Sequence, residues 1–160
     1  MQIIVGVVVL LVIGVGAYFF IAGNANNKTT KDQVTDDTTV QTLSPQDIGL
    51  KLEAAPDSKK VRFTIAKASD IKSIEYELTY EANSTAQEQS EGSDARVQRG
   101  ITGQATISSG DSSYQSTWLI LGSQSANVVR YDTGVKSVNI TLKITKASGK
   151  VYQVQDKLSL

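Results

Sequence analysis

The chain has 160 residues, in which 16 Lys and Arg balance 16 Asp and Glu, and it contains neither histidine nor cysteine. These absences exclude a Ser-His-Asp triad, a thiolate nucleophile, metal or haem ligation through His or Cys, and any disulfide. A formal net charge of zero gives no sign of nucleic-acid binding, and we expect no cofactor.

The first feature along the chain is an apolar run over residues 3–22 that contains no charged side chain. Its length matches a bilayer core, so it predicts one transmembrane helix in contact with membrane lipid. Tyr18, Phe19 and Phe20 lie near its end, where aromatic rings favour the headgroup boundary. A cleaved secretory signal is the alternative, because Gly23-Asn24-Ala25 resembles a peptidase site. No charged side chain precedes the run, so we interpret residues 1–23 as a signal-anchor.

Two features bear on the orientation of this segment, and they point in opposite directions. Lys28 and Lys31 follow the span, and by the positive-inside rule they favour a cytoplasmic C-terminal part. A helix placed at the N-terminus, ahead of a polar linker and a β domain, favours export instead. We therefore expect a single-pass protein of the cell membrane whose C-terminal domain is extracytoplasmic.

Residues 24–45 predict a flexible polar linker. This stretch is rich in Asn, Thr, Asp and Gln, and its larger apolar side chains are Val34, Val40 and Leu43. Such a composition buries too little surface to offset the entropy lost on ordering. Ser44-Pro45 marks the entrance to the folded part, which we assign to residues 46–160.

The first half of this domain shows a period of two, the pattern of half-buried strands. The alternating apolar positions are Ile48, Leu50 and Leu52, then Val61, Phe63 and Ile65, and then Ile74, Tyr76, Leu78 and Tyr80. Residues 82–95 are too polar for a core. A further strand is indicated by Val97, Ile101, Ala105 and Ile107, with Gly100 and Gly103 predicting a bulge or bend.

The second half predicts three more segments. Residues 118–121 are apolar on both faces, which is typical of a strand covered on both sides, and residues 128–131 favour a short strand. The turn Ser148-Gly149 separates two alternating runs and predicts a hairpin. The apolar positions of that hairpin are Val138, Ile140, Leu142 and Ile144, followed by Tyr152, Val154 and Leu158.

Seven or eight short strands without an amphipathic helix predict an all-β fold, a two-sheet sandwich. At the level of the fold, residues 46–160 resemble immunoglobulin-like and fibronectin type III modules. Trp118 and Tyr76 would be the inner aromatic residues of such a module, although the cysteine pair of true immunoglobulin domains is missing. The resemblance implies adhesion or spacing as the role.

Two short motifs resemble catalytic signatures. Asp132-Thr133-Gly134 matches the active-site tripeptide of aspartic proteases, in which two carboxylates share a proton. A turn between strands accounts for the same residues. Ser69 and Lys72 fit the Ser-x-x-Lys of penicillin-binding enzymes, but they precede a strand instead of starting a helix.

Three other patterns could mark sites, and each has a simpler explanation. Sequons occur at Asn27, Asn83 and Asn139. Carboxylates that could hold calcium stand near turns, at Asp47, Asp57, Asp70, Asp94 and Asp111, where solvated turn residues are also usual. An isopeptide bond of the kind found in surface pilins would use Lys51, Glu75 or Glu77, and Asn139.

The sequence thus predicts no catalytic, cofactor-binding or metal site. The leading hypothesis is a membrane-anchored surface module with a structural, adhesive or partner-binding role, whose partner is an unknown protein or surface. A pilin-like filament subunit is the alternative, with self-association through the N-terminal helix, although Val5 stands where a mature pilin usually has Glu. An aspartic-protease-like enzyme using Asp132 is the third hypothesis.

Overall fold

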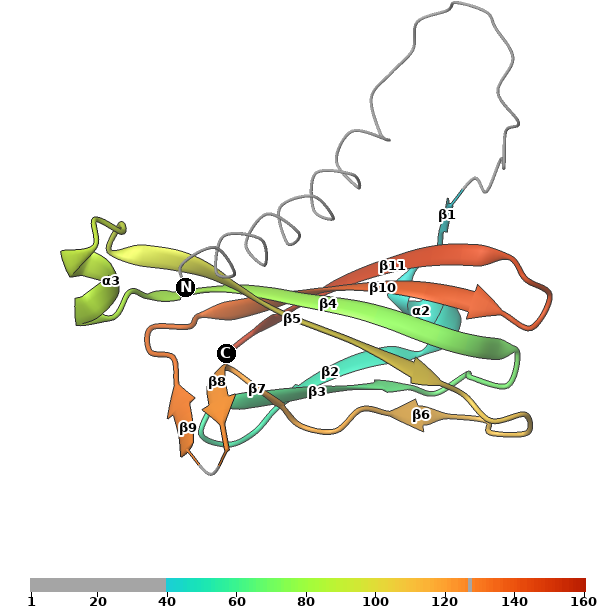
Figure 1. The fold of residues 1–160 in the computed structure, drawn as a ribbon. Coiled ribbons are helices and arrows are strands. Elements are labelled where there is room, and N and C mark those ends of the chain that lie inside the picture. Colours follow the sequence, from blue (N-terminus) through green and yellow to red (C-terminus); the bar gives the residue numbers. More distant parts are fainter. Residues whose placement is uncertain (1–39, 127) are drawn as a thin grey trace, which may run out of the picture. The chain divides into compact units, whose positions relative to one another are not determined.

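The computed structural model describes residues 40–126 and 128–160 (Figure 1). The predicted membrane segment over residues 3–22 and most of the predicted linker lie outside these residues. Within the described part of the chain, no helix is both long enough and apolar enough to cross a bilayer.

Most of the described chain forms strands, and the largest sheet has five of them in the order β1-β11-β10-β4-β5. All neighbours are antiparallel except β1 and β11, which are parallel. The strands are β1 (Gln41–Thr42), β4 (Ile71–Asn83), β5 (Arg96–Thr106), β10 (Ser137–Lys146) and β11 (Val151–Ser159).

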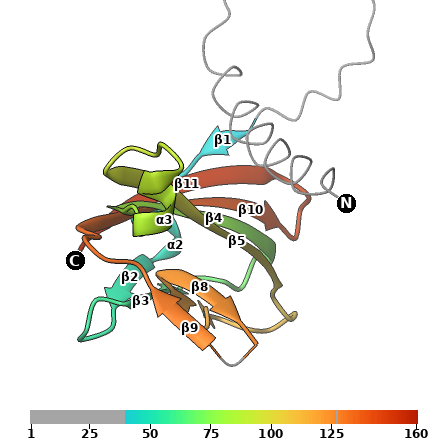
Figure 2. The ribbon, with the colours of Figure 1, turned by 60° about the vertical axis from the view of Figure 1, so that its left-hand side comes forward.

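The second sheet is built on β3 (Lys60–Ile65), which pairs with β2 (Leu50–Ala54) along one side. Its other side pairs first with β7 (Leu119–Ile120) and then with β6 (Tyr114–Gln115). A separate hairpin joins β8 (Gly122–Ser125) to β9 (Val128–Tyr131). Figures 1 and 2 both draw β2 and β3 facing the five-stranded sheet.

One hydrophobic core lies between the two sheets. On β10 the side chains of Val138, Ile140, Leu142 and Ile144 are no more than 1 % exposed, and on β3 those of Val61, Phe63 and Ile65 are fully buried. The Phe63 ring of one sheet meets the Tyr76 ring of the other edge-on, with centroids 5.2 Å apart. An all-β fold with facing sheets is therefore confirmed, and it is compatible with a β-sandwich.

Two short helices interrupt the strands. In α2 (Pro45–Ile48), Ser44 is the N-cap, Asp47 completes a capping box, and Gly49 ends the helix with a left-handed φ of 63°. The prediction of Ile48 as a strand residue was wrong, because it lies in this helix, although it is buried. The second helix, α3 (Ala86–Ser90), lies in the polar segment between β4 and β5 and begins at the N-cap Thr85.

The structure differs from the sequence-based expectation at three further points. The described residues form eleven strands, where the sequence predicts seven or eight. Two-residue strands such as β6 and β7 are too short for an alternating pattern to be recognised in the sequence. Gln41 and Thr42 of the predicted linker form β1. Gly100 and Gly103 make no bulge, since the β4–β5 register runs without a shift from Ser73–Thr106 to Asn83–Arg96.

Trp118 is not an inner residue. Its side chain is 38 % exposed, because the strand begins one residue later and Leu119, not Trp118, faces the core. The Arg62 guanidinium lies 4.4 Å from the centroid of the indole. The prediction that residues 118–121 are covered on both faces was therefore wrong for Trp118.

Candidate functional site

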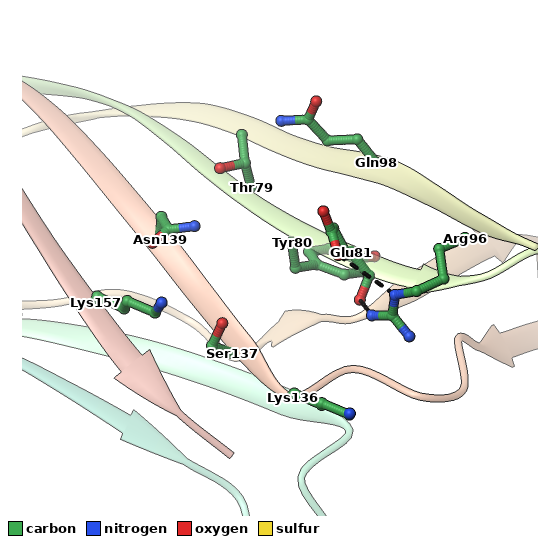
Figure 3. Close-up of a pocket in the computed structure, with 9 residues that line it drawn as sticks. All are labelled: Thr79, Tyr80, Glu81, Arg96, Gln98, Lys136, Ser137, Asn139 and Lys157. Carbon is green, nitrogen blue, oxygen red and sulfur yellow. Dashed lines mark hydrogen bonds and ion pairs between the residues drawn. The ribbon is translucent and has the colours of Figure 1, made fainter. Parts of the chain in front are cut away.

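A polar groove of about 510 Å³ runs over the outer face of the five-stranded sheet, near the end where β4 leads into α3 (Figure 3). Its side chains come from four strands and from the residue before β10. They are amides, hydroxyls and charged groups, and Figure 3 shows them spread over the sheet surface. The groove is lined by Thr79, Tyr80, Glu81, Arg96, Gln98, Lys136, Ser137, Asn139 and Lys157.

The strand register assembles this groove. Even-numbered residues of β4 and β10 fill the core, so their odd-numbered neighbours point to the outer face. Asn139 lies opposite both Thr79 of β4 and Lys157 of β11, which places three side chains in one row across the sheet. Glu81 and Gln98 form part of the adjacent row. The site therefore depends on pairings between residues up to 60 positions apart, the separation of Thr79 and Asn139.

The carboxylate of the groove is already neutralised. Arg96 Nε lies 3.3 Å from Glu81 Oε2, and the other guanidinium nitrogens donate to Asn83 Oδ1 and to the carbonyl oxygens of Glu81 and Gly134. Lys136 and Lys157 form no ion pair with any residue that the structure describes. The groove therefore offers two ammonium groups, alongside neutral donors and acceptors, to an incoming ligand.

Asp132, the candidate protease carboxylate, lies in a network beneath the same end of the sheet. Tyr80 Oη donates to Asp132 Oδ2 over 2.9 Å, and Arg99 Nε lies 3.6 Å from the same oxygen. Arg99 also pairs with Glu88 of α3 over 2.7 Å. Burial, followed by the hydrogen bond to Asp132, raises the pKa of Tyr80 well above its usual value. The Arg99 guanidinium lowers the pKa of Glu88 to about 2.

The Asp-Thr-Gly tripeptide forms the turn between β9 and β10. Gly134 adopts a left-handed φ of 71°, and the Thr133 carbonyl accepts a hydrogen bond from the Asn83 amide over 2.8 Å. Within the described residues, the hydrogen-bond and ion-pair partners of the Asp132 carboxylate are a phenol and a guanidinium. This geometry matches a structural carboxylate that joins β4, β5 and the β9–β10 turn.

The other candidate sets are placed apart. Lys51 and Asn139 are exposed residues on strands of different sheets, so the components of an isopeptide bond are not brought together. Glu75 is paired with Lys143 over 3.0 Å. Ser69 and Lys72 are exposed at the turn into β4, where Asp70 pairs with Lys146 over 2.6 Å.

The sequons and turn carboxylates have separate surroundings. Asn83 ends β4 instead of lying in a loop, and Asn139 lies within β10, while Asn27 lies outside the described residues. Asp47 caps α2, and Asp57 accepts a hydrogen bond from the Lys59 amide. In residues 40–126 and 128–160, no three Asp or Glu side chains are grouped so that they could hold a metal ion.

A second surface feature was not anticipated from the sequence. Three large hydrophobic side chains after β6 are exposed, namely Trp118, Val128 and Tyr131. Two of them are covered by cations, because Arg62 lies over Trp118 and Lys59 Nζ lies 5.1 Å from the Tyr131 ring centroid. Cation–π attraction of this kind stabilises the two aromatic rings in their exposed positions.

No family model, no curated protein and no solved structure matches this chain. The polar groove was also missed by sequence reasoning. Its residues are common polar types at the solvent-facing positions of strands, and only the register of β4, β5, β10 and β11 shows that they adjoin.

Proposed function

We propose that the chain is a membrane-anchored, extracytoplasmic module with an immunoglobulin-like fold that binds a surface partner. Residues 3–22 provide the anchor in this proposal, and the polar groove provides the contact. The observation that carries it is the pair of lysines, Lys136 and Lys157, left without carboxylate partners among the described residues on an otherwise hydrogen-bonding surface.

The order of the strands supports the immunoglobulin-like assignment. Lettered along the chain, β2, β3 and the β6–β7 pair take the places of strands A, B and E in one sheet. The other sheet has β11, β10, β4 and β5 in the places of G, F, C and C′. Immunoglobulin-type sandwiches divide their strands between sheets in this way. The added hairpin β8–β9 and the exposed Trp118 are departures from the common pattern.

The topology is tested by protease treatment of intact cells that express the chain with a C-terminal epitope. We expect the epitope to disappear while a cytoplasmic marker survives, because the domain is placed outside. A variant without residues 1–23 is the control, and it should escape cleavage if it stays in the cytoplasm. An epitope that is protected on intact cells and cleaved after lysis would contradict the export of the domain.

Anchoring is tested separately by washing membranes with alkaline carbonate. The full-length chain is expected to remain with the membranes, because an apolar helix of this length is held by the bilayer core. The variant lacking residues 1–23 is expected in the wash. Release of the unprocessed full-length chain by carbonate would contradict the anchor, whatever the result of protease treatment.

A filament subunit is the second candidate, and the free edge of β5 favours it. This strand has 11 residues and stands at the end of the sheet order, so one side of its backbone has no strand partner among the described residues. Such an edge can pair with another chain. Electron microscopy of surface preparations distinguishes filaments from dispersed monomers.

A further inference from the structure

We infer that the groove over β4, β5, β10 and β11 binds acidic polysaccharide, meaning a hydroxyl-rich chain that carries carboxylate or sulfate groups. This inference rests on the proposed function, because it names the ligand of the same groove. Three properties of the lining point to this class: its charge, its lack of an exposed aromatic side chain, and its mixture of donors and acceptors.

The charge of the groove favours an anionic ligand. Arg96 and Glu81 neutralise each other at 3.3 Å, so Lys136 and Lys157 account for the remaining charge of the groove. An approaching anion therefore meets two ammonium groups and no free carboxylate among the described lining residues. Opposite charges at such a surface attract ligands and make binding sensitive to salt.

The lack of an exposed aromatic side chain in the lining disfavours ligands that are held by stacking. The aromatic residue of the groove is Tyr80, and its side chain is directed to the core side, where it is 3 % exposed and bonded to Asp132. Recognition of single-stranded nucleic acid depends on aromatic platforms beneath the bases. This groove has no such platform among its lining residues, which separates it from a site for single-stranded nucleic acid.

The neutral groups suit hydroxyls. The Thr79 and Ser137 hydroxyls and the Gln98 and Asn139 amides can each both donate and accept hydrogen bonds. Sugar hydroxyls have the same dual capacity, so neighbouring hydroxyls of a sugar can form hydrogen bonds with side chains in adjacent rows of the sheet. Both amides are free of side-chain hydrogen bonds to the described protein residues, which leaves them available to a ligand.

The type of cation also bears on affinity. The Arg96 fork is occupied by Glu81, Asn83 and Gly134, so no two-pronged clamp on an anionic group is available. Lysines act as point charges, and exposed pairs of charges contribute little individually. A single acidic sugar is thus held weakly, whereas a polymer presented to many anchored copies gains through multivalency.

The test measures binding of the full-length chain, in a non-ionic polyoxyethylene detergent, to immobilised polygalacturonate, with dextran as the neutral glycan and polyphosphate as the sugar-free anion. We expect binding to polygalacturonate that weakens with added salt, and none to dextran. The double variant Lys136→Gln/Lys157→Gln is expected to bind polygalacturonate up to about tenfold more weakly. The matched control Lys72→Gln/Lys150→Gln removes two exposed lysines from the other end of the sheet and is expected to bind as the unchanged chain does.

A second variant separates the hydrogen bonds from the charge. Gln98→Ala/Asn139→Ala is expected to weaken binding to polygalacturonate but not to polyphosphate. The inference is overturned if Lys136→Gln/Lys157→Gln binds polygalacturonate as well as the unchanged chain does. It is also overturned if the control Lys72→Gln/Lys150→Gln weakens that binding by the same factor. If the amide variant binds polygalacturonate and polyphosphate equally weakly, or binds both as the unchanged chain does, the polysaccharide assignment is overturned. The protease and carbonate experiments are independent of these results, so failure of the anchor or of export is distinguished from failure of the ligand.

Discussion

Gly103 of β5 lies directly opposite Tyr76 of β4, and the Tyr76 phenol lies across the position that a Cβ on Gly103 would occupy. The same ring meets Phe63 of the facing sheet edge-on. Gly103 therefore gives Tyr76 the room to lie flat along its own sheet while it contacts the other. Gly103 makes no bulge, and close side-chain packing is the physical reason for its presence.

This contact predicts that Gly103→Ala lowers the free energy of unfolding by about 1–3 kcal/mol, because the added methyl overlaps the Tyr76 ring. Gly100→Ala is the matched control. Its nearest neighbour is the Leu78 carbonyl oxygen at 4.0 Å, so stability should be unchanged or slightly raised. Chemical denaturation measures both. If Gly103→Ala lowers the free energy of unfolding by the same amount in a Tyr76→Val variant as in the unchanged chain, the overlap with Tyr76 is not the cause.

Asp132 is predicted to serve the fold and not peptide hydrolysis. Asp132→Asn keeps an oxygen for the Tyr80 hydroxyl and loses the charge facing Arg99, so we expect a loss of about 1 kcal/mol in the free energy of unfolding. Asp132→Leu leaves that hydroxyl without its acceptor and should cost more, about 2–3 kcal/mol. Casein hydrolysis measured beside these unfolding curves checks the assignment. Hydrolysis by the unchanged chain that vanishes in a fully folded Asp132→Asn variant would restore the protease hypothesis.

The ion pair between Glu88 and Arg99 predicts a pH dependence of stability. The hydrogen bond from Arg99 lowers the pKa of Glu88 from 4.5 to about 2. A carboxyl with a lowered pKa stabilises the folded state fully above its unfolded value, and this contribution is lost as the pH falls from 4.5 through 2. The unchanged chain should therefore melt at a higher temperature than Glu88→Gln at pH 6, and the two should converge near pH 2.

Two controls accompany this measurement. Glutamine can still complete the capping box with Thr85, so Glu88→Gln isolates the charge. Glu91→Gln changes a carboxylate in the same segment that pairs with Gln87 and not with Arg99. A difference in melting temperature between the unchanged chain and Glu88→Gln that stays constant from pH 6 to pH 2 would argue against the linkage.

Much of the sheet architecture could be predicted from local pattern. On β10 and β4, strict alternation placed Val138, Ile140, Ile74 and Leu78 in the core, and all are buried. The Ser148-Gly149 turn correctly predicted the β10–β11 hairpin. These elements are long and one-sided, so a period of two is visible over many residues.

Features that depend on few residues or on distant partners could not be predicted in this way. The four-residue helix α2 is too short for helical periodicity, although its capping residues are present in the sequence. Arg99 occupies an inward position of β5, and only its pairing with Glu88 and Asp132 explains how a charge is accommodated there. The groove requires the register of four strands.

The stacking of Arg62 on Trp118 predicts a spectroscopic effect, because Trp118 is the single tryptophan of the chain. Arg62 is held in place by Glu53, whose Oε2 lies 3.0 Å from its Nε. Arg62→Gln should raise the quenching of Trp118 fluorescence by acrylamide and lower stability by about 0.5–1 kcal/mol, since the cation over the ring is lost. Lys59→Gln, which removes the cation over Tyr131 instead, should leave the quenching unchanged. Equal quenching in the unchanged chain and Arg62→Gln would mean that the guanidinium does not shield the indole in solution.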